Sequence, residues 1–168
     1  MTIQTAWPET EPAAETNRAA APALVSVIVP LYNEAESAGQ LYRELDEVLG
    51  DWEHPYELVL VDDGSADGTG QIIDELSELD PHVVALHLRR NFGQTAAMMA
   101  GIDHSAGAIL VTLDGDLQND PADIPALVQR LTEGYDVVSG WRRNRQDRGL
   151  SRVLPSKCAN WLIRRISG

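Results

Sequence analysis

Short apolar runs alternate with amphipathic stretches along most of the chain, and this alternation predicts its secondary structure. The runs contain β-branched and aliphatic residues and end at turn formers, which is typical of buried strands. The predicted strands are Leu24–Val29, Tyr56–Val61, Val83–Leu88, Ile109–Leu113 and Asp136–Ser139. Because strands and helices alternate, we expect an α/β fold with a mostly parallel sheet covered by helices.

The stretches between the apolar runs have the periodicity of amphipathic helices. In the first stretch Ala38, Leu41 and Leu45 recur at helical spacing, with Glu and Arg on the opposite face. The other predicted helices carry the stripe Ile72–Leu79, span Thr95–His104, begin near Pro121, or extend from about Ser151 to Ile166. Asn33 and Asp67 precede the first two helices, so we expect these side chains to cap them.

Composition and length indicate one globular domain after a disordered tail. Residues 1–22 are rich in Ala, Pro, Glu and Thr and lack apolar periodicity, which predicts the tail. Residues 23–168 suffice for one domain with its own core. Cys158 is the only cysteine, which excludes an internal disulfide and fits a reducing compartment. No apolar run approaches the ~18 residues that span a bilayer, so the sequence predicts a soluble chain.

The net charge of −13 conceals a basic segment on an acidic chain. Residues 142–165 contain eight of the thirteen Lys and Arg residues and one acid, so this segment carries +7 and the remainder −20. The acidic remainder argues against general nucleic-acid binding. The basic segment suggests one anionic partner, a phosphate or an anionic membrane surface, although a solvated basic helix has the same composition.

Candidate chemistry is concentrated where the fourth apolar run ends, in Asp114-Gly115-Asp116-Leu117-Gln118. In open α/β sheets ligands bind outside the carboxyl ends of the strands, where these residues fall. The carboxylates of Asp114 and Asp116 and the amide oxygen of Gln118 are hard donors, suited to Mg²⁺ or Mn²⁺ shared with substrate phosphates. A polar turn uses the same residue types, so the pattern by itself leaves both interpretations open.

Two further loops, Pro30–Glu34 and Asp62–Gly68, follow other predicted strands and would open on the same edge of a parallel sheet. The three loops together could hold a nucleotide diphosphate, with Asp62 or Asp63 accepting hydrogen bonds from the base or the ribose hydroxyls. The glycine spacings of a Rossmann dinucleotide site and of a P-loop are both missing. Adjacent strand-end acids also fit a receiver-like signalling domain, but that requires a lysine at a later strand end, and Lys157 lies elsewhere.

Five stretches of the chain together form a recognisable pattern: VSVIVPLYNEAES, LVLVDDGSADGT, LRRNFGQTAAMMAGI, ILVTLDGDLQNDPADI and GYDVVSGWRRNRQDRGLSRVLPSKCANWLI. This pattern resembles that of family 2 glycosyltransferases of the GT-A fold. Within that family the sequence is most similar to the polyprenyl-phosphate glycosyltransferases, the group of dolichol-phosphate mannose synthase and the undecaprenyl-phosphate sugar transferases. The resemblance extends from Leu24 to Gly168 and implies a Rossmann-like, mostly parallel sheet with helices on both faces.

The resemblance also implies roles for the candidate residues of the nucleotide and metal sites. The residues that would line the nucleotide-sugar pocket are Pro30, Tyr32, Glu34, Asp62, Asp63 and Asp114, with Asp62 near the base. Asp114 and Asp116 match the DXD pair, and Gln118 matches the glutamine that joins the metal shell, with Mg²⁺ or Mn²⁺ as the cofactor.

A second set of residues matches the ligands of the acceptor lipid phosphate: Arg142, Arg152 and Ser156. Arg152 and Ser156 are spaced i and i+4, so they would share one helix face. Arg142 would also act in catalysis, beside Asp114 and Asp116.

The sequence therefore predicts a metal-dependent, inverting transfer of a sugar from a nucleotide diphosphate-sugar to a polyprenyl phosphate, for cell-envelope glycan or glycolipid synthesis. A non-catalytic nucleotide-sugar-binding protein is the alternative. We expect a peripheral location at the cytoplasmic face of the membrane. Relatives continue past the position of Gly168, so we expect a C-terminally truncated GT-A domain, whose exposed Trp161, Leu162 and Ile166 favour a homo-oligomer.

Overall fold

The structure, a computed structural model, describes residues 22–140. The chain separates into two units, Met1–Val138 and Ser139–Gly168, and the fold described below belongs to the first. The tail predicted for residues 1–22 lies outside the described residues except for Pro22, and so does the helix predicted from Ser151 to Ile166.

The elements alternate in the predicted order. The strands are β1 (Val25–Leu31), β2 (Tyr56–Asp62), β3 (Val83–His87) and β4 (Ile109–Thr112). The helices are α1 (Ala35–Leu49), α2 (Thr69–Leu79), α3 (Gln94–His104) and α4 (Ile124–Thr132), with a short 3₁₀ helix, η1 (Pro121–Asp123), before α4. Asp120 caps η1 by accepting a hydrogen bond from the Ala122 amide.

The four strands form one parallel sheet in the order β3-β2-β1-β4. In the register, Val25 of β1 is level with Tyr56 of β2 and with Ile109 of β4. All seven residues of β1 are buried, because helices cover both faces of this central strand. Parallel pairing brings the carboxyl ends of all four strands to one edge, the carboxyl edge, and leaves their amino ends at the opposite edge, the amino edge.

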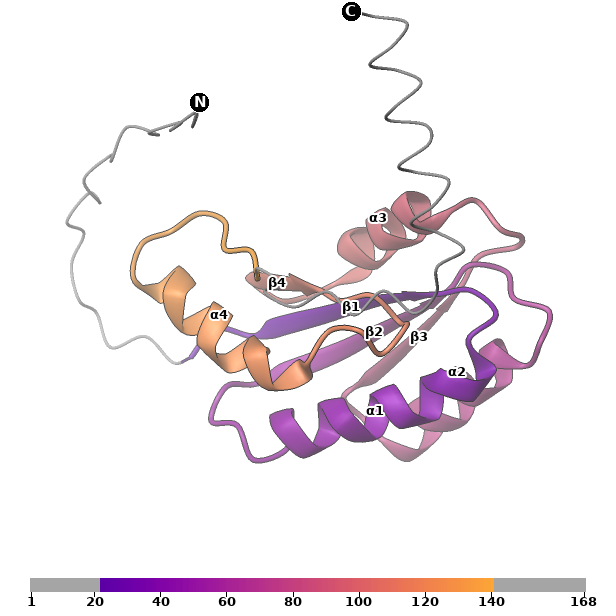
Figure 1. The fold of residues 1–168 in the computed structure, drawn as a ribbon, viewed down its shortest axis with the longest axis horizontal. Coiled ribbons are helices and arrows are strands. Elements are labelled where there is room, and N and C mark those ends of the chain that lie inside the picture. Colours follow the sequence, from indigo (N-terminus) through magenta and orange to yellow (C-terminus); the bar gives the residue numbers. More distant parts are fainter. Residues whose placement is uncertain (1–21, 141–168) are drawn as a thin grey trace, which may run out of the picture. The chain divides into compact units, whose positions relative to one another are not determined.

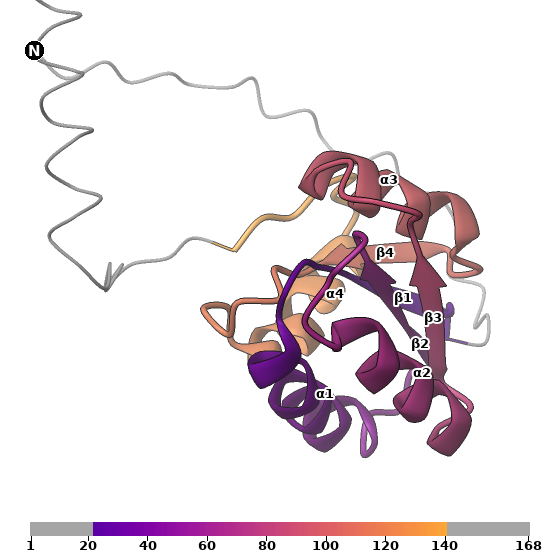
Figure 2. The ribbon, with the colours of Figure 1, turned by 90° about the vertical axis from the view of Figure 1, so that its right-hand side faces the viewer.

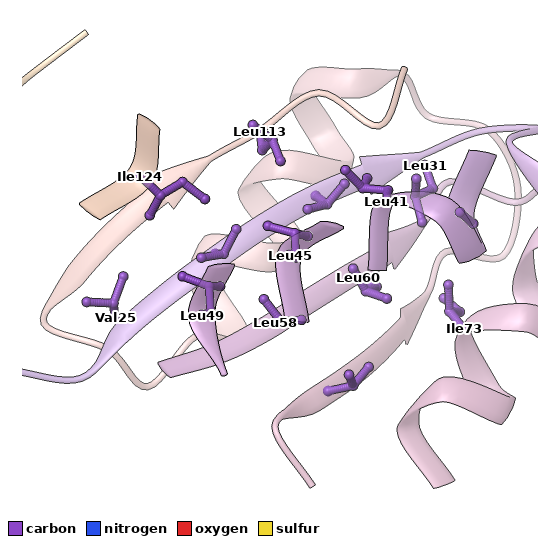
Figure 3. Packing of buried hydrophobic residues seen from close by; sticks show 14 of the residues in the cluster. Val25, Leu31, Leu41, Leu45, Leu49, Leu58, Leu60, Ile73, Leu113 and Ile124 are labelled. Atoms are coloured by element: carbon purple, nitrogen blue, oxygen red, sulfur yellow. The ribbon is translucent and has the colours of Figure 1, made fainter. Parts of the chain in front are cut away.

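Helices cover the two faces of the sheet unequally. Figures 1 and 2 show α1 and α2 on one face and α3 on the other. Alternate β1 residues pack on opposite faces of the sheet, in two clusters of buried hydrophobic side chains. Val27 packs in the larger cluster with Leu45 of α1, whereas Ile28 packs in the smaller one with Ala97 of α3. The larger cluster also contains Ile124, so α4 lies on the α1 face (Figure 3).

Two sequence-based expectations about local structure are wrong. Asp136–Ser139 is not a strand: no sheet partner flanks it within residues 22–140, and Val137 is 84% exposed. Asn33 does not cap α1, whose N-cap is Glu34, because the Asn33 side chain accepts a hydrogen bond from the Ala66 amide instead.

Asp67 does not occupy the N-cap position of α2, which is Gly68. Its carboxylate nevertheless accepts hydrogen bonds from the amides of Thr69, the first residue of α2, and Ala35, the first residue of α1. Asp67 therefore links the starts of two helices that were expected to be capped separately.

Candidate active site

A cavity of about 320 Å³ opens at the carboxyl edge of the sheet. Its walls come from the loops that follow β1, β2, β3 and β4. The lining residues are Pro30, Leu31, Tyr32, Glu34, Asp63, Asn91, Gly93, Gln94, Asp114, Gly115 and Asp116. The structure thus brings together most of the residues assigned to nucleotide and metal binding from the sequence, since parallel pairing places all these loops at one edge.

The adjacent acids at the end of β2, Asp62 and Asp63, accept hydrogen bonds from the protein itself. Asp63 is 2% exposed, and its two carboxylate oxygens accept hydrogen bonds from the amides of Phe92 (2.8 Å) and Gly93 (2.9 Å). Asp63 therefore fixes the loop after β3, one wall of the cavity. Sequence reasoning assigned this residue only to the ligand and missed this structural function.

Asp62 lies outside the lining of this cavity. It is 6% exposed, and its Oδ1 accepts a hydrogen bond from the Ser65 amide at 2.9 Å. Its Oδ2 lies 3.5 Å from the ring nitrogen Nδ1 of His87 on β3. These contacts stabilise the turn after β2, and contact of Asp62 with a base stays a prediction.

Asp114 and Asp116 flank a glycine that lies close against the end of β1. Gly115 is buried, and a Cβ at this position would lie 2.5 Å from Cδ2 of Leu31. No larger residue fits without displacing Leu31, which is why the loop can press against the end of β1. Gly115 thereby brings both flanking aspartates to the same cavity.

The Asp114 carboxylate is held by a side chain that sequence reasoning missed. Gln94, at the start of α3, donates from Nε2 to Oδ1 of Asp114 at 2.6 Å and lines the cavity itself. Asn91 and Gly93 of the same loop are further lining residues. The loop position was the available signal, since Arg89–Gln94 follows a strand of the same parallel sheet.

The donor chemistry of the cavity fits a divalent cation held in part by the protein. Asp114 and Asp116 both line the cavity. Oδ1 of Asp116 accepts a hydrogen bond from the backbone amide of Gln118 at 3.2 Å. Gln118 itself does not line it. Within residues 22–140 there is no group of three His, Cys, Asp or Glu side chains placed to hold a metal. Two carboxylates match Mg²⁺, which keeps several waters and shares substrate phosphates.

The acceptor-site residues Arg142, Arg152 and Ser156 lie outside the described residues. Between residues 22 and 140, no helix has the length and apolar character needed to cross a membrane.

Comparison with known proteins gives consistent matches. Residues 26–166 match the family described as glycosyl transferase family 2. The chain is 44% identical over 162 residues to a dodecaprenyl-phosphate galacturonate synthase of Rhizobium johnstonii, covering 94% of this chain and 47% of that protein. It is 46% identical over 145 residues to an undecaprenyl-phosphate 4-deoxy-4-formamido-L-arabinose transferase of Klebsiella pneumoniae, covering 86% and 44%. The chain thus spans about half the length of these relatives.

Solved structures share the fold. S. aureus TarS, residues 1–349, in complex with UDP-GlcNAc matches with a TM-score of 0.55 and 25% identity, covering 65% of this chain and 31% of that one. A mannosyltransferase of Pyrobaculum calidifontis in complex with GDP-Man and Mn²⁺ matches with a TM-score of 0.53 and 24% identity, covering 70% and 34%. The expected GT-A fold is confirmed, and the chain belongs to glycosyl transferase family 2.

Proposed function

We propose that this chain binds a nucleotide diphosphate-sugar at the carboxyl-edge cavity and serves the transfer of its sugar to a polyprenyl phosphate. The observation that carries the proposal is the convergence of Tyr32, Glu34, Asp114 and Asp116 on one cavity. The acceptor class is supported by the relatives, which are named as dodecaprenyl-phosphate and undecaprenyl-phosphate sugar enzymes. A bound UDP-GlcNAc in TarS supports the donor class.

The cavity offers different chemistry to the two parts of the donor. Tyr32 is 47% exposed and presents a ring against which a base can stack. Glu34 and Asp63 carry the acceptor oxygens for ribose or base groups, although Asp63 already uses both oxygens for backbone amides. Asp62 is proposed to lie near the base, within the turn that it stabilises.

Asp114 and Asp116, with Gln118 as a third donor, would hold Mg²⁺ or Mn²⁺ beside the diphosphate. When bound, the cation neutralises charge on the departing nucleotide diphosphate. Gln94 holds the Asp114 carboxylate at the cavity wall before any ligand arrives. The protein would therefore contribute by orienting the side-chain oxygens that bind the cation.

The acceptor needs positioning more than a strong base, because a phosphate monoester has a second pKa of about 6 and is already an anion at neutral pH. Arg142 and Arg152, with Ser156, would position that phosphate, since Arg matches phosphate oxygens with a planar fork of donors. The Lys and Arg residues of the basic segment 142–165 would also be attracted to an anionic membrane surface, by about 1 kcal/mol for each cation near it. We propose a peripheral location at the cytoplasmic face on this basis.

Nucleotide binding tests the donor site directly. UDP and GDP are titrated into the chain by calorimetry, with and without Mn²⁺. We expect at least one diphosphate to bind about tenfold more tightly with Mn²⁺, because the cation links its phosphates to two carboxylates. Asp116→Asn should abolish that gain.

The matched control is Asp123→Asn, which removes the same charge from an exposed aspartate outside the cavity lining. It should leave the Mn²⁺ effect unchanged. Equal nucleotide affinity with and without Mn²⁺ in the unmodified chain would refute the metal assignment. Binding without transfer to a polyprenyl phosphate would favour a nucleotide-sugar-binding protein over an enzyme.

A further inference from the structure

Three consecutive backbone amides after β1 donate to side chains between the end of β2 and the first residue of α2. The Asn33 amide donates to Oγ of Ser65 (2.9 Å), and the Glu34 amide donates to Oγ1 of Thr69 (2.9 Å). The Ala35 amide donates to Oδ2 of Asp67 (3.0 Å). The acceptors are thus Ser65, Asp67 and Thr69, spaced two residues apart, and we call them the bracket.

The bracket is braced internally by the Asp67 carboxylate. Oδ1 of Asp67 accepts hydrogen bonds from the Thr69 amide (3.0 Å) and the Thr69 hydroxyl (2.6 Å), while Oδ2 accepts from Ala35. The hydrogen bond from the Thr69 hydroxyl is the main cause that lowers the pKa of Asp67 below its ordinary 3.8. An ionised acceptor strengthens the hydrogen bonds it receives.

The loop after β1 also accepts a hydrogen bond from the loop after β2. Oδ1 of Asn33 accepts a hydrogen bond from the Ala66 amide (3.0 Å), while Asn33 itself has a positive φ of 54°. At the base of both loops, the Asp63 amide donates to the Leu31 carbonyl (2.8 Å). The backbone is therefore hydrogen-bonded to residues 63–69 at Leu31, Asn33, Glu34 and Ala35, that is, on both sides of Tyr32.

Two residues of the loop between β1 and α1 line the candidate active-site cavity. Tyr32 and Glu34 lie on its wall, whereas none of the three bracket residues touches it. An ordinary helix start would need one capping side chain, but here three side chains hold three successive amides. More amides are therefore held than the start of α1 requires. The same hydrogen bonds restrict the backbone around Asn33 and so the orientation of its neighbours, Tyr32 and Glu34.

We propose that Ser65, Asp67 and Thr69 are positioning residues that hold Tyr32 and Glu34 in the orientation that receives the nucleotide diphosphate. This inference rests on the proposed function, and it deepens that function by assigning the rigidity of one cavity wall to a neighbouring loop. A wall already ordered before binding loses little conformational entropy when the ligand arrives, which raises affinity.

The test compares Thr69→Val, which removes the hydroxyl at nearly constant shape, with Thr69→Ser, which keeps it. We expect Thr69→Val to weaken diphosphate binding about tenfold in the presence of Mn²⁺, because the Glu34 amide loses its acceptor and the brace to Asp67 is lost. Thr69→Ser should bind within about twofold of the unmodified chain, since it retains both hydrogen bonds. Thr132→Val, at an exposed threonine that ends α4 and does not line the cavity, is the control and should bind normally.

Hydrogen exchange gives a readout that does not depend on ligand. The amides of Asn33, Glu34 and Ala35 should exchange about tenfold faster in Thr69→Val, while the core amides of β1 keep their protection. Because Thr69 is fully buried, Ser65→Ala supplies a second variant outside the core, and it should release the Asn33 amide.

The outcomes separate the two proposals. If the unmodified chain binds no diphosphate, the proposed function is wrong, and exchange at the three amides still tests the bracket. If the unmodified chain binds while Thr69→Val and Ser65→Ala bind equally well and protect the three amides equally well, the bracket has no positioning function and this inference is overturned.

Discussion

The two edges of the sheet use aspartate in different ways. At the carboxyl edge, Asp62, Asp63 and Asp67 accept hydrogen bonds mainly from backbone amides of neighbouring loops. At the amino edge lies a second cavity of about 710 Å³, lined partly by ring side chains. There Asp80 accepts from the side chains of Tyr42 and His82 as well as from the His82 amide.

Aromatic packing dominates the amino edge. Tyr56 stacks on His82 with ring centres 4.5 Å apart, and Trp52 lies against His54 at 4.6 Å. The Tyr42 hydroxyl, on α1, donates to Asp80 at the end of α2 at 3.0 Å. These contacts join helices to one another and to the start of the strands, so they stabilise the scaffold.

The comparison shows that aspartates at the carboxyl edge hold loops mainly through backbone amides, whereas the contacts at the amino edge are made mainly between side chains. A carboxylate that holds amides fixes the path of a loop, and hence every side chain the loop presents. A carboxylate that holds a phenol fixes only the distance between two elements. Substitutions at the carboxyl edge should therefore change ligand binding and stability together, and those at the amino edge should change stability alone.

The largest effect is expected for Asp63→Ala. Two partly buried backbone amides, of Phe92 and Gly93, lose charged acceptors, which should lower the free energy of unfolding by about 3 kcal/mol. Diphosphate binding should also fall, because the loop carrying Gly93 and Gln94 lines the cavity. Urea unfolding and calorimetry measure the two effects. Loss of stability with unchanged affinity would show that the loop's path does not matter to the ligand.

The sequence predicts which loops meet at the carboxyl edge better than it predicts the hydrogen bonds between them. Apolar runs such as Leu24–Val29, separated by amphipathic stretches, allow little besides a parallel sheet, so loops far apart in the chain were expected together. The partners of Asp63 and Asp67 could not be predicted, because a carboxylate beside a turn has many amides within reach and tertiary structure selects among them. Gln94 was missed because its partner, Asp114, comes from a different loop.

The fifth predicted strand was wrong because a segment forms a strand only when another segment pairs with it. Asp136–Ser139 has the composition of a short strand, yet a strand needs a neighbour to receive its hydrogen bonds. No sheet partner flanks it in the part of the chain that the structure describes, where β4 pairs only with β1. Local pattern predicts the capacity to form a strand, and the partner decides whether one forms.

The second prediction concerns Asp80→Asn at the amino edge. Partial burial, the largest influence on its pKa, acts upward, but hydrogen bonds from His82 and Tyr42 together lower the pKa below its ordinary 3.8. A lowered pKa contributes stability above pH 3.8 that is lost as the pH falls through the folded-state value. Asp80→Asn should lower the unfolding free energy at pH 7 by about 1 kcal/mol.

Urea unfolding at neutral and acidic pH measures this effect, and the difference between Asp80→Asn and the unmodified chain should shrink in acid. Diphosphate affinity should stay within twofold. A larger loss of affinity would contradict the separation between the two edges, because Asp80 belongs to the amino-edge cavity and not to the carboxyl-edge one.

The smallest effect is expected for Tyr42→Phe, and it appears most clearly at alkaline pH. Burial, followed by the hydrogen bond to Asp80, raises the pKa of Tyr42 from 10.0 to about 12. The folded state thus keeps the phenol proton longer than the unfolded state, so the contribution is complete below pH 10 and is lost as the pH rises toward about 12. Phenylalanine retains the ring and removes the titration, so the neutral-pH cost should be only about 0.5–1 kcal/mol. Unfolding free energy measured in urea should therefore fall less steeply above pH 10 in the variant than in the unmodified chain. Parallel declines in the two proteins would mean that the Tyr42–Asp80 bond does not join α1 to α2 in solution, and the amino edge would then depend on its ring packing alone.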